Sequence, residues 1–385
     1  MSQRAPRSGR RARTRTTSSP RRAGLPGRWQ WGRISTRTRR KDPGLGDRRS
    51  AARPAGPLRW AVVVVGGGLA TQLAGCGRTS PSTLDPHGPG ADRVARLWWL
   101  LFWISAVVFA VVTVLVLVAL ARRRGDRDTL VRRGGGEALI VIGGVIVPAV
   151  VLTAVYVVGL RDLRALTVPA QTDLTVEVTG HDWWWEVRYP DQGIVSADEI
   201  HVPVGRPVRL VLTSRDVIHS FWVPQLTVKT DLIPGHTNTT WIQASTPGTY
   251  RGQCAEYCGL QHAKMAILVV AEPADAFARW LANEERPAAA PTDPLTMRGR
   301  LALERNSCAA CHTVRGTTAS GTLGPDLTHF GGRRTIGAGT LANTRGNLGG
   351  WIINSQTVKP GNRMPPQPLT PEELQALLAY LESLK

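Results

Sequence analysis

Two long, uncharged apolar stretches restrict how this chain can fold. They cover residues 97–120 and 138–160, and neither contains Asp, Glu, Lys or Arg. About 20 apolar residues are enough to cross the hydrocarbon core of a membrane as a helix. Both stretches are apolar all round, whereas a surface helix of a soluble domain has a single apolar stripe. We therefore expect a two-helix transmembrane hairpin, with two buried helices of a soluble domain as the alternative.

Charge orients this hairpin. The loop between the two stretches carries Arg122, Arg123, Arg124, Arg127, Arg132 and Arg133. Short loops rich in Lys and Arg stay on the cytoplasmic side, so the chain before residue 97 and after residue 161 is expected on the outer face. Pro148 is expected to kink the second helix without ending it, as membrane helices tolerate.

The first 75 residues are expected to be a leader. Residues 1–60 hold 18 of the 48 basic residues and two of the 28 acidic ones, so the net charge of +20 belongs mainly to this segment and argues against a nucleic-acid partner. An apolar run after Arg59 ends in Leu-Ala-Gly-Cys at 73–76, which is typical of a secretory signal and resembles a bacterial lipobox. Cys76 would then carry a lipid anchor. The leader is long, so either the translation start lies further on or an extended tail precedes the signal.

A compact set of soft metal ligands lies in the segment CAEYCGLQHAKM, residues 254–265. With one histidine from upstream, the set is His219, Cys254, Cys258, His262 and Met265. Thiolates, imidazoles and a thioether favour copper, and a mononuclear blue-copper site needs only one Cys. Two thiolates can bridge two copper ions, with one His on each, Met265 as a weak axial ligand and the Glu256 carbonyl on the other ion. A Cys254–Cys258 disulfide is the alternative.

The region around this ligand set reads as a β domain. Between residues 168 and 282, short runs such as TDLTVEVTG and KMAILVVAE are separated by Pro, Gly, Asn and Asp. Such runs predict six or more strands in a sandwich or barrel. The ligand loop lies between the last two of them.

A second metal motif follows a Pro/Ala-rich linker at 283–294. Cys308, Cys311 and His312 form Cys-x-x-Cys-His, the attachment motif of a c-type haem, with a redox dithiol as the alternative. Met364 in KPGNRMPP is the expected sixth iron ligand, and His329 is its rival.

A helix ends the chain. Thr370, Pro371 and Glu373 predict its capped start, and Leu374, Leu377, Leu378 and Leu381 predict its apolar face.

Together these features resemble subunit II of a caa-type cytochrome c oxidase, in a bacterial lipoprotein form with a fused cytochrome c. The resemblance covers residues 76–385. It implies a multidomain membrane protein with a transmembrane hairpin (76–167), a cupredoxin-like Greek-key barrel carrying copper A (168–282) and an all-α class I cytochrome c domain (295–385). The family passes electrons from a bc complex or cytochrome c through the haem and the dinuclear copper to subunit I, which reduces oxygen with proton translocation. Subunit I and subunit III would be the partners.

The resemblance also implies roles for further residues, and no catalytic residue of the oxygen chemistry lies in this chain. In GHDWWWEVRYP, Trp183 would receive electrons, with Trp185 beside it. The Pro325 carbonyl would hold the ring of His312, and the Glu256 carboxylate would reach a magnesium ion shared with subunit I. The family's acidic residue at a proton channel is expected at position 141, which is Val141 here, so Glu137 is the candidate one turn earlier.

Three rival functions were compared with this interpretation. A quinol oxidase subunit would lack the copper ligands, and a nitrous oxide reductase would need a large His-rich domain. A stand-alone electron-transfer lipoprotein with copper and haem remains the alternative, and it would not purify with a haem-copper subunit.

Overall fold

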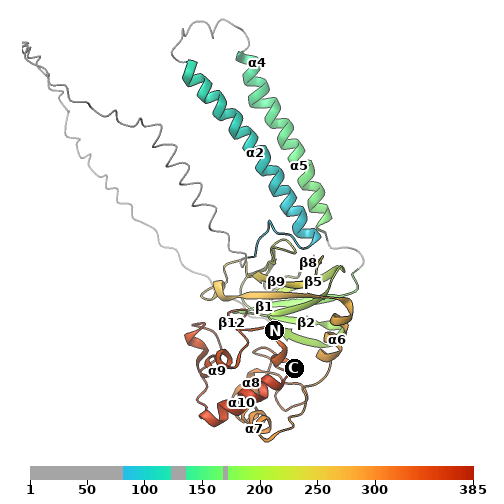
Figure 1. Cartoon of the computed structure of the whole chain (residues 1–385), viewed down its shortest axis with the longest axis vertical. Helices are drawn as coiled ribbons and strands as arrows, with labels where there is room; N and C mark the ends of the chain where they lie inside the picture. The colour runs from blue at the N-terminus through green and yellow to red at the C-terminus, as the bar shows by residue number, and fades with distance from the viewer. Residues whose placement is uncertain (1–80, 123–135, 168–171) are drawn as a thin grey trace, which may run out of the picture. The chain divides into compact units, whose positions relative to one another are not determined.

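The computed structural model describes residues 81–122, 136–167 and 172–385 (Figure 1). The leader, Cys76 and most of the arginine-rich loop lie outside the described residues, so the expectations for them stay predictions.

The two apolar stretches form two helices long enough to cross a membrane, as the sequence predicts. The first is α2 (Pro89–Arg122), with a mean hydropathy of 3.0 in its most apolar window. The second runs through α4 (Gly136–Val141), a π-helical turn (Ile142–Ile146) and α5 (Val147–Ala165), with a mean hydropathy of 2.7. Pro148 lies in the first turn of α5. A proline has no N–H for the preceding turn and its ring crowds the carbonyl four residues back, which accounts for the wider turn before it.

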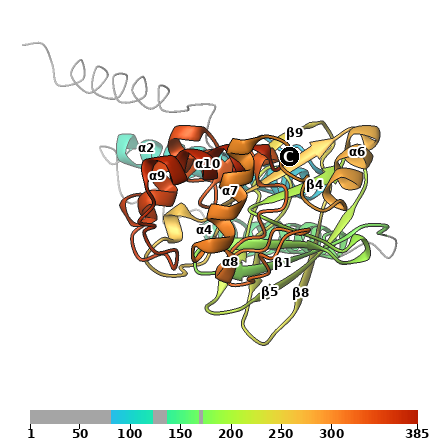
Figure 2. The same ribbon diagram turned by 90° about the horizontal axis from the view of Figure 1, so that it is seen from below.

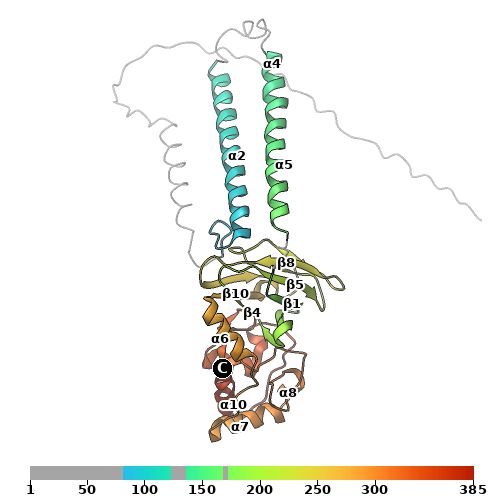
Figure 3. The same ribbon diagram turned by 90° about the vertical axis from the view of Figure 1, so that its right-hand side faces the viewer.

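The β domain, from β1 to α6, contains a five-stranded and a three-stranded sheet. The larger has the order β3-β2-β1-β5-β8 and the smaller β4-β10-β9. Strands β1, β5 and β8 lie side by side in Figures 2 and 3. The bounds are β1 (Thr175–His181), β2 (Trp184–Tyr189), β3 (Ile194–Ala197), β4 (Glu199–Pro203), β5 (Val208–Ser214), β6 (His219–Phe221), β7 (Thr230–Leu232), β8 (Asn238–Ile242), β9 (Gly248–Gln253) and β10 (Ala266–Glu272).

The pairing of these strands follows from their apolar patterns. Burial alternates along β1, so Val176 and Val178 face the core, as a period of two requires. Strand β10 is buried along almost its whole length between β4 and β9. It pairs parallel with β4 and antiparallel with β9. One core, which includes Trp185 and Tyr189, fills the domain.

One helix in this region was not predicted from the short apolar runs. Helix α6 (Ala274–Glu284) follows β10 directly. Its apolar residues recur at helical spacing, and Phe277 and Trp280 pack against the β-domain core. The Trp280 ring stacks on His201 with the ring centres 4.2 Å apart. The helix therefore extends the β domain up to the linker.

The C-terminal domain, from α7 to the end of the chain, is mainly helical. It contains α7 (Pro294–Arg305), α8 (Cys308–Cys311), α9 (Arg345–Asn354) and α10 (Pro371–Ser383), with a short pair β11 (Thr335–Ile336) and β12 (Leu341–Ala342). The predicted capping box of Thr370 and Glu373 is confirmed at the start of α10. Helices α7 and α10 lie against each other (Figure 2). They approach closely at Gly299, where a Cβ atom would come 2.0 Å from the carbonyl oxygen of Ala376.

Candidate copper and haem centres

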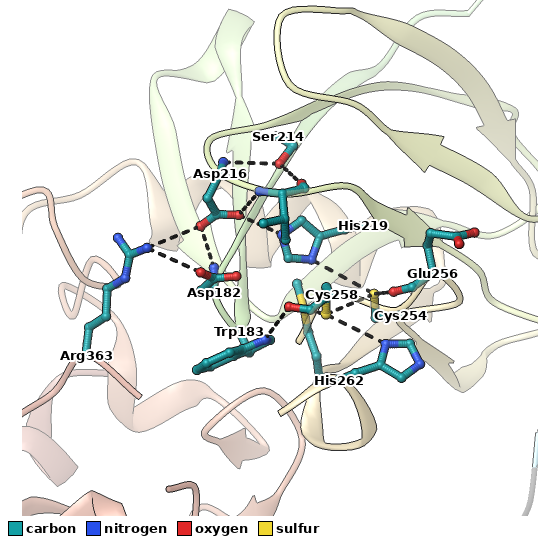
Figure 4. A network of polar contacts seen from close by, with 12 residues as sticks. Asp182, Trp183, Ser214, Asp216, His219, Cys254, Glu256, Cys258, His262 and Arg363 are labelled. Carbon is teal, nitrogen blue, oxygen red and sulfur yellow. Dashed lines mark hydrogen bonds and ion pairs between the residues drawn. The ribbon is translucent and has the colours of Figure 1, made fainter. Parts of the chain in front are cut away.

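The β domain brings the five predicted soft ligands to one place. His219 begins β6, Cys254 follows β9, and His262 begins a 3-10 turn (His262–Lys264). Met265 directly precedes β10, and Cys258 lies in the loop between β9 and β10. Strands on both sides of the loop therefore hold it, and β6 supplies the remaining histidine (Figure 4).

The donor atoms of this set face one another. The Sγ atoms of Cys254 and Cys258 are 3.7 Å apart, and both cysteines are free thiols. The Cys258 Sγ is 3.7 Å from the His262 Nδ1 and 3.8 Å from the Met265 Sδ. The Cys254 Sγ is 4.0 Å from the His219 Nδ1 and 3.2 Å from the Glu256 carbonyl oxygen. The arrangement is that of ligands around a shared centre, not of a disulfide.

Burial and hydrogen bonding prepare these ligands for a metal. His219 and Met265 have no exposed surface, and the two cysteines are at most 4 % exposed. The partner thiol Cys258 holds the pKa of Cys254 down to about 3, while the same contact and burial raise the pKa of Cys258. Metals bind thiolates and not thiols, so the proton that remains on Cys258 would have to leave when a cation enters.

Asp216 orients one of the imidazoles. Its carboxylate oxygen lies 2.8 Å from the Nε2 atom of His219, which leaves Nδ1 directed at the sulfur atoms. Burial lowers the pKa of His219, but the bonds to Asp216 and Cys254 outweigh it and raise the value to about 9. A carboxylate on the second nitrogen is a common way to set the orientation and basicity of a metal-binding histidine.

The donor set fits a dinuclear, thiolate-bridged copper centre. Two sulfurs lie between two imidazole nitrogens, with a thioether and a carbonyl nearby, and such soft donors select copper over harder cations. A bound copper pair would supply a one-electron redox couple at this position. The Glu256 carboxylate is engaged elsewhere, because it accepts a bond of 2.6 Å from Lys229.

Trp183 and Trp185 each contact one residue of this set. The Trp183 indole N–H donates to the Cys258 carbonyl at 2.8 Å, so a half-buried ring joins the domain surface to a metal-binding residue. Trp185 is fully buried and meets the His219 ring edge-on, with the ring centres 6.0 Å apart. Only Trp183 therefore lies within reach of the domain surface.

The predicted haem ligands are arranged in the C-terminal domain. Cys308 and Cys311 begin and end α8, and His312 follows in an extended conformation. The His312 Nδ1 donates to the Pro325 carbonyl at 2.7 Å. A Cβ atom on Gly324 would come 2.6 Å from the ring of His312, so only glycine allows this close packing. The ring is therefore held with its Nε2 atom free, which fits an axial haem ligand.

The two candidates for the sixth ligand differ in their surroundings. Met364 is half-buried beside the domain core, and Ser355 and Gln356 bind its backbone carbonyl. In contrast, His329 faces the backbone carbonyls of Lys385 and Arg286 with its two ring nitrogens. These contacts favour Met364.

Several site residues were not identified from the sequence. Asp216 precedes His219 by three positions, and that spacing was a usable signal for a carboxylate behind a metal-binding histidine. Three others were missed as well: Arg363 pairs with Asp182, and Lys359 donates to the Trp183 carbonyl, and these contacts form only in the folded chain. No local pattern marks them.

A buried two-thiolate ligand set in a cupredoxin-like domain, joined to a cytochrome-type domain and two membrane helices, defines a membrane-bound respiratory electron carrier. Residues 194–272 match the periplasmic domain of cytochrome c oxidase subunit II, and residues 297–385 match cytochrome c. The chain belongs to the cytochrome c oxidase subunit II family, in the form with a fused cytochrome c domain.

The match with each of two curated relatives covers nearly the whole length of that relative. The cytochrome c oxidase subunit 2 of Alkalihalophilus pseudofirmus is 36 % identical, over 81 % of this chain and 94 % of the relative. That of Bacillus sp. strain PS3 is 33 % identical, over 86 % of this chain and 99 % of the relative. A crystal structure of the periplasmic domain of subunit II from Bradyrhizobium japonicum is 36 % identical over 31 % of this chain and 97 % of that chain, with a TM-score of 0.30.

The family assignment fixes the coarse function. The chain is part of an oxidase enzyme complex, associates with other oxidase subunits and takes part in electron transport at a membrane. The family implies copper A in the β domain and haem in the C-terminal domain. The family assignment therefore supports the oxidase subunit over its alternative, the stand-alone lipoprotein.

Proposed function

We propose that this chain takes electrons through a covalently bound haem c, passes them to a dinuclear copper A centre and delivers them to the haem-copper subunit I, where oxygen is reduced and protons are translocated. The convergence of His219, Cys254, Cys258, His262 and Met265 carries this proposal.

The residues around the copper site have two tasks. His219, Cys254 and Cys258 are buried among the strands, so water is kept from the ligands and their positions change little when an electron arrives. Asp216 keeps the His219 ring in one orientation. Rigid ligands suit a carrier that must accept and release an electron without rearrangement.

The residues of the C-terminal domain have corresponding tasks. Cys308 and Cys311 would attach the haem through thioethers, and His312, held by Pro325, would bind its iron on one side. Met364 would bind on the other side, and a methionine ligand raises the haem potential. A raised potential suits a carrier that receives electrons after quinol oxidation.

The remaining assignments follow the family. The β and C-terminal domains would lie on the outer face of the membrane, with Cys76 as a lipid anchor. The donor would be a bc complex or another cytochrome c, and subunit III would join subunit I as a partner. Glu256 would leave Lys229 to bind magnesium shared with subunit I, and Glu137, in the first turn of α4, would serve the proton channel. The domain bounds 76–167, 168–282 and 295–385 belong to this proposal.

Metal analysis of the full chain, purified in detergent, tests the proposal. We expect two copper ions per haem and an electron paramagnetic resonance spectrum in which one unpaired electron is shared by both copper nuclei. A single copper ion, or a Cys254–Cys258 disulfide after copper loading under reducing conditions, would contradict it. An electron paramagnetic resonance spectrum in which the unpaired electron belongs to a single copper nucleus would also contradict the proposal.

A further inference from the structure

The loop that carries Met364 lies against the metal-binding loop of the β domain. The Gln261 amide donates to the Pro360 carbonyl at 2.5 Å, and the Lys264 ammonium donates to the Val358 carbonyl. A Cβ atom on Gly361 would come 2.9 Å from the Leu260 side chain. Residues 358–361 therefore contact the segment between Cys258 and Met265, over a chain separation of about a hundred residues.

Lys359 is the most buried contact in this loop. Its side chain is 2 % exposed, and its ammonium donates to the Trp183 carbonyl at 2.6 Å and to the Gly337 carbonyl at 3.1 Å. Burial lowers its pKa to about 8, and the nearby Asp198 carboxylate partly opposes this. A lysine is rarely buried so completely unless its ammonium is paired, so the contact is a specific one.

Arg363, next to Met364, reaches a second residue pair of the β domain. Its guanidinium lies 3.3 Å from the Asp182 carboxylate and 3.8 Å from that of Asp216 (Figure 4). Asp216 in turn binds the His219 ring. A short series of polar contacts thus joins the Met364 loop to a copper ligand, while Lys359 joins it to Trp183.

Two buried carboxylates of the β domain take their partners from the C-terminal domain. Asp198 accepts from the Ala338 backbone N–H at 3.1 Å. Glu199 accepts from the backbone N–H groups of Arg334 and Thr335 at 2.6 and 3.2 Å. Separation of the domains would leave these buried carboxylates without those donors, which is costly. These hydrogen bonds therefore favour a lasting contact between the two domains.

We propose that Lys359 and Arg363 are positioning residues that hold the Met364 loop on Trp183 and on the copper-ligand loop, so that electrons cross within one lasting domain contact. This rests on the proposed function. With haem held by His312 and copper held by Cys254 and Cys258, the residues between them would only have to keep the two sites close, because the transfer of one electron would exchange no bond or proton. Lys359 and Gly361 of the C-terminal domain lie against Trp183, so we expect an external donor to deliver its electrons to the haem.

The test uses the full chain within the purified oxidase and four variants. These are Lys359→Met, Arg363→Gln, the double variant, and Arg345→Gln as a matched control. Arg345 also forms an ion pair, with Glu382, but within the C-terminal domain. Two quantities are measured: the rate at which photoreduced haem passes its electron to copper, and hydrogen exchange of the backbone in residues 334–339 and 355–364.

We expect the double variant to transfer electrons at least about fivefold more slowly, because an exposed ion pair and a buried charged hydrogen bond are both removed. Both segments should exchange faster, while the control matches the unaltered chain. Asp182→Asn combined with Arg363→Gln should transfer electrons no more slowly than Arg363→Gln alone, since both substitutions remove the same contact between these two residues.

Unaltered transfer rates and unaltered exchange in the double variant would overturn this inference. If Lys359→Met loses haem, Arg363→Gln decides the matter, because its side chain is largely exposed and its replacement leaves the core intact. Failure of the proposed function looks different. In that case the unaltered chain itself passes no electron from haem to copper, while hydrogen exchange still reports whether the two residues hold the domains together.

Discussion

The two thiols of the loop at 254–265 differ in proton affinity although they are only four positions apart. Hydrogen bonding from Cys258 lowers the pKa of Cys254 to about 3, while the resulting thiolate raises the pKa of Cys258. The two pKa values move apart because the sulfur atoms are only 3.7 Å from each other. A cation bound between the two sulfur atoms would offset the repulsion between two thiolates, so both thiols could then lose their protons.

Met265 is the ligand whose replacement should be best tolerated. It is fully buried, and Leu has a similar volume, so Met265→Leu should cost less than about 1.5 kcal/mol of folding free energy. We expect the variant to keep two copper ions with an altered reduction potential, whereas Cys254→Ser should lose the shared-electron signal. Redox titration and electron paramagnetic resonance measure both. An unchanged spectrum in Cys254→Ser would rule out the thiolate bridge.

Pairs of strands in the β domain carry polar contacts that depend on pH. Glu186 on β2 accepts a bond of 2.5 Å from Arg188 and lies 3.7 Å from the His181 ring nitrogen on β1. Burial raises the pKa of Glu186, but its bonds to His181 and Arg188 outweigh this and lower it to about 2. The folded state therefore prefers the ionised carboxylate.

This preference predicts acid sensitivity of the β1–β2 pair. The stabilisation is complete above the ordinary glutamate pKa of 4.5 and is lost as the pH falls from about 4.5 to 2. It amounts to about 3 kcal/mol at most, and solvent screening of the partly exposed Arg188 makes it smaller. Denaturant unfolding at pH 6 and pH 3 measures it, with Glu186→Gln as the reference. The variant should lose less stability on acidification, and equal losses in both proteins would contradict the assignment.

At the scale of the whole molecule, the two apolar helices differ from the other domains in how much apolar surface they expose. Many of the large exposed apolar side chains lie on α2, α4 and α5, including Phe109 and Leu152, whereas the two buried cores begin only at Leu174 and at Leu303. None of the described hairpin residues belongs to either core. Its exposed surface suits lipid.

A fragment of residues 172–385 should therefore fold without the hairpin. We expect it to be monodisperse without detergent and to bind copper and haem in the same ratio as the full chain, because both cores and all proposed ligands lie within it. Size-exclusion chromatography with metal and haem analysis measures this. Aggregation of the fragment together with loss of haem would show that a core depends on the membrane segment.

Much of this architecture could be read from the sequence because its signals are local. A run of apolar residues, the alternation in β1 and the capping box of α10 each lie within one element, and the structure confirms them. The spacing of Cys308, Cys311 and His312 is local in the same way. Helix α6 was not predicted, because Pro273 alone separates its amphipathic pattern from the last strand.

The sequence by itself determined the class of each part, since residue chemistry at fixed spacing predicts copper ligands and a haem motif without a fold. Only the tertiary structure decided how these parts meet. Lys359 and Trp183 are 176 positions apart, and Arg363 and Asp182 are 181 apart, so no local pattern pairs them. Such contacts arise from the packing of two separately folded cores, and packing depends on surfaces that a linear pattern does not contain.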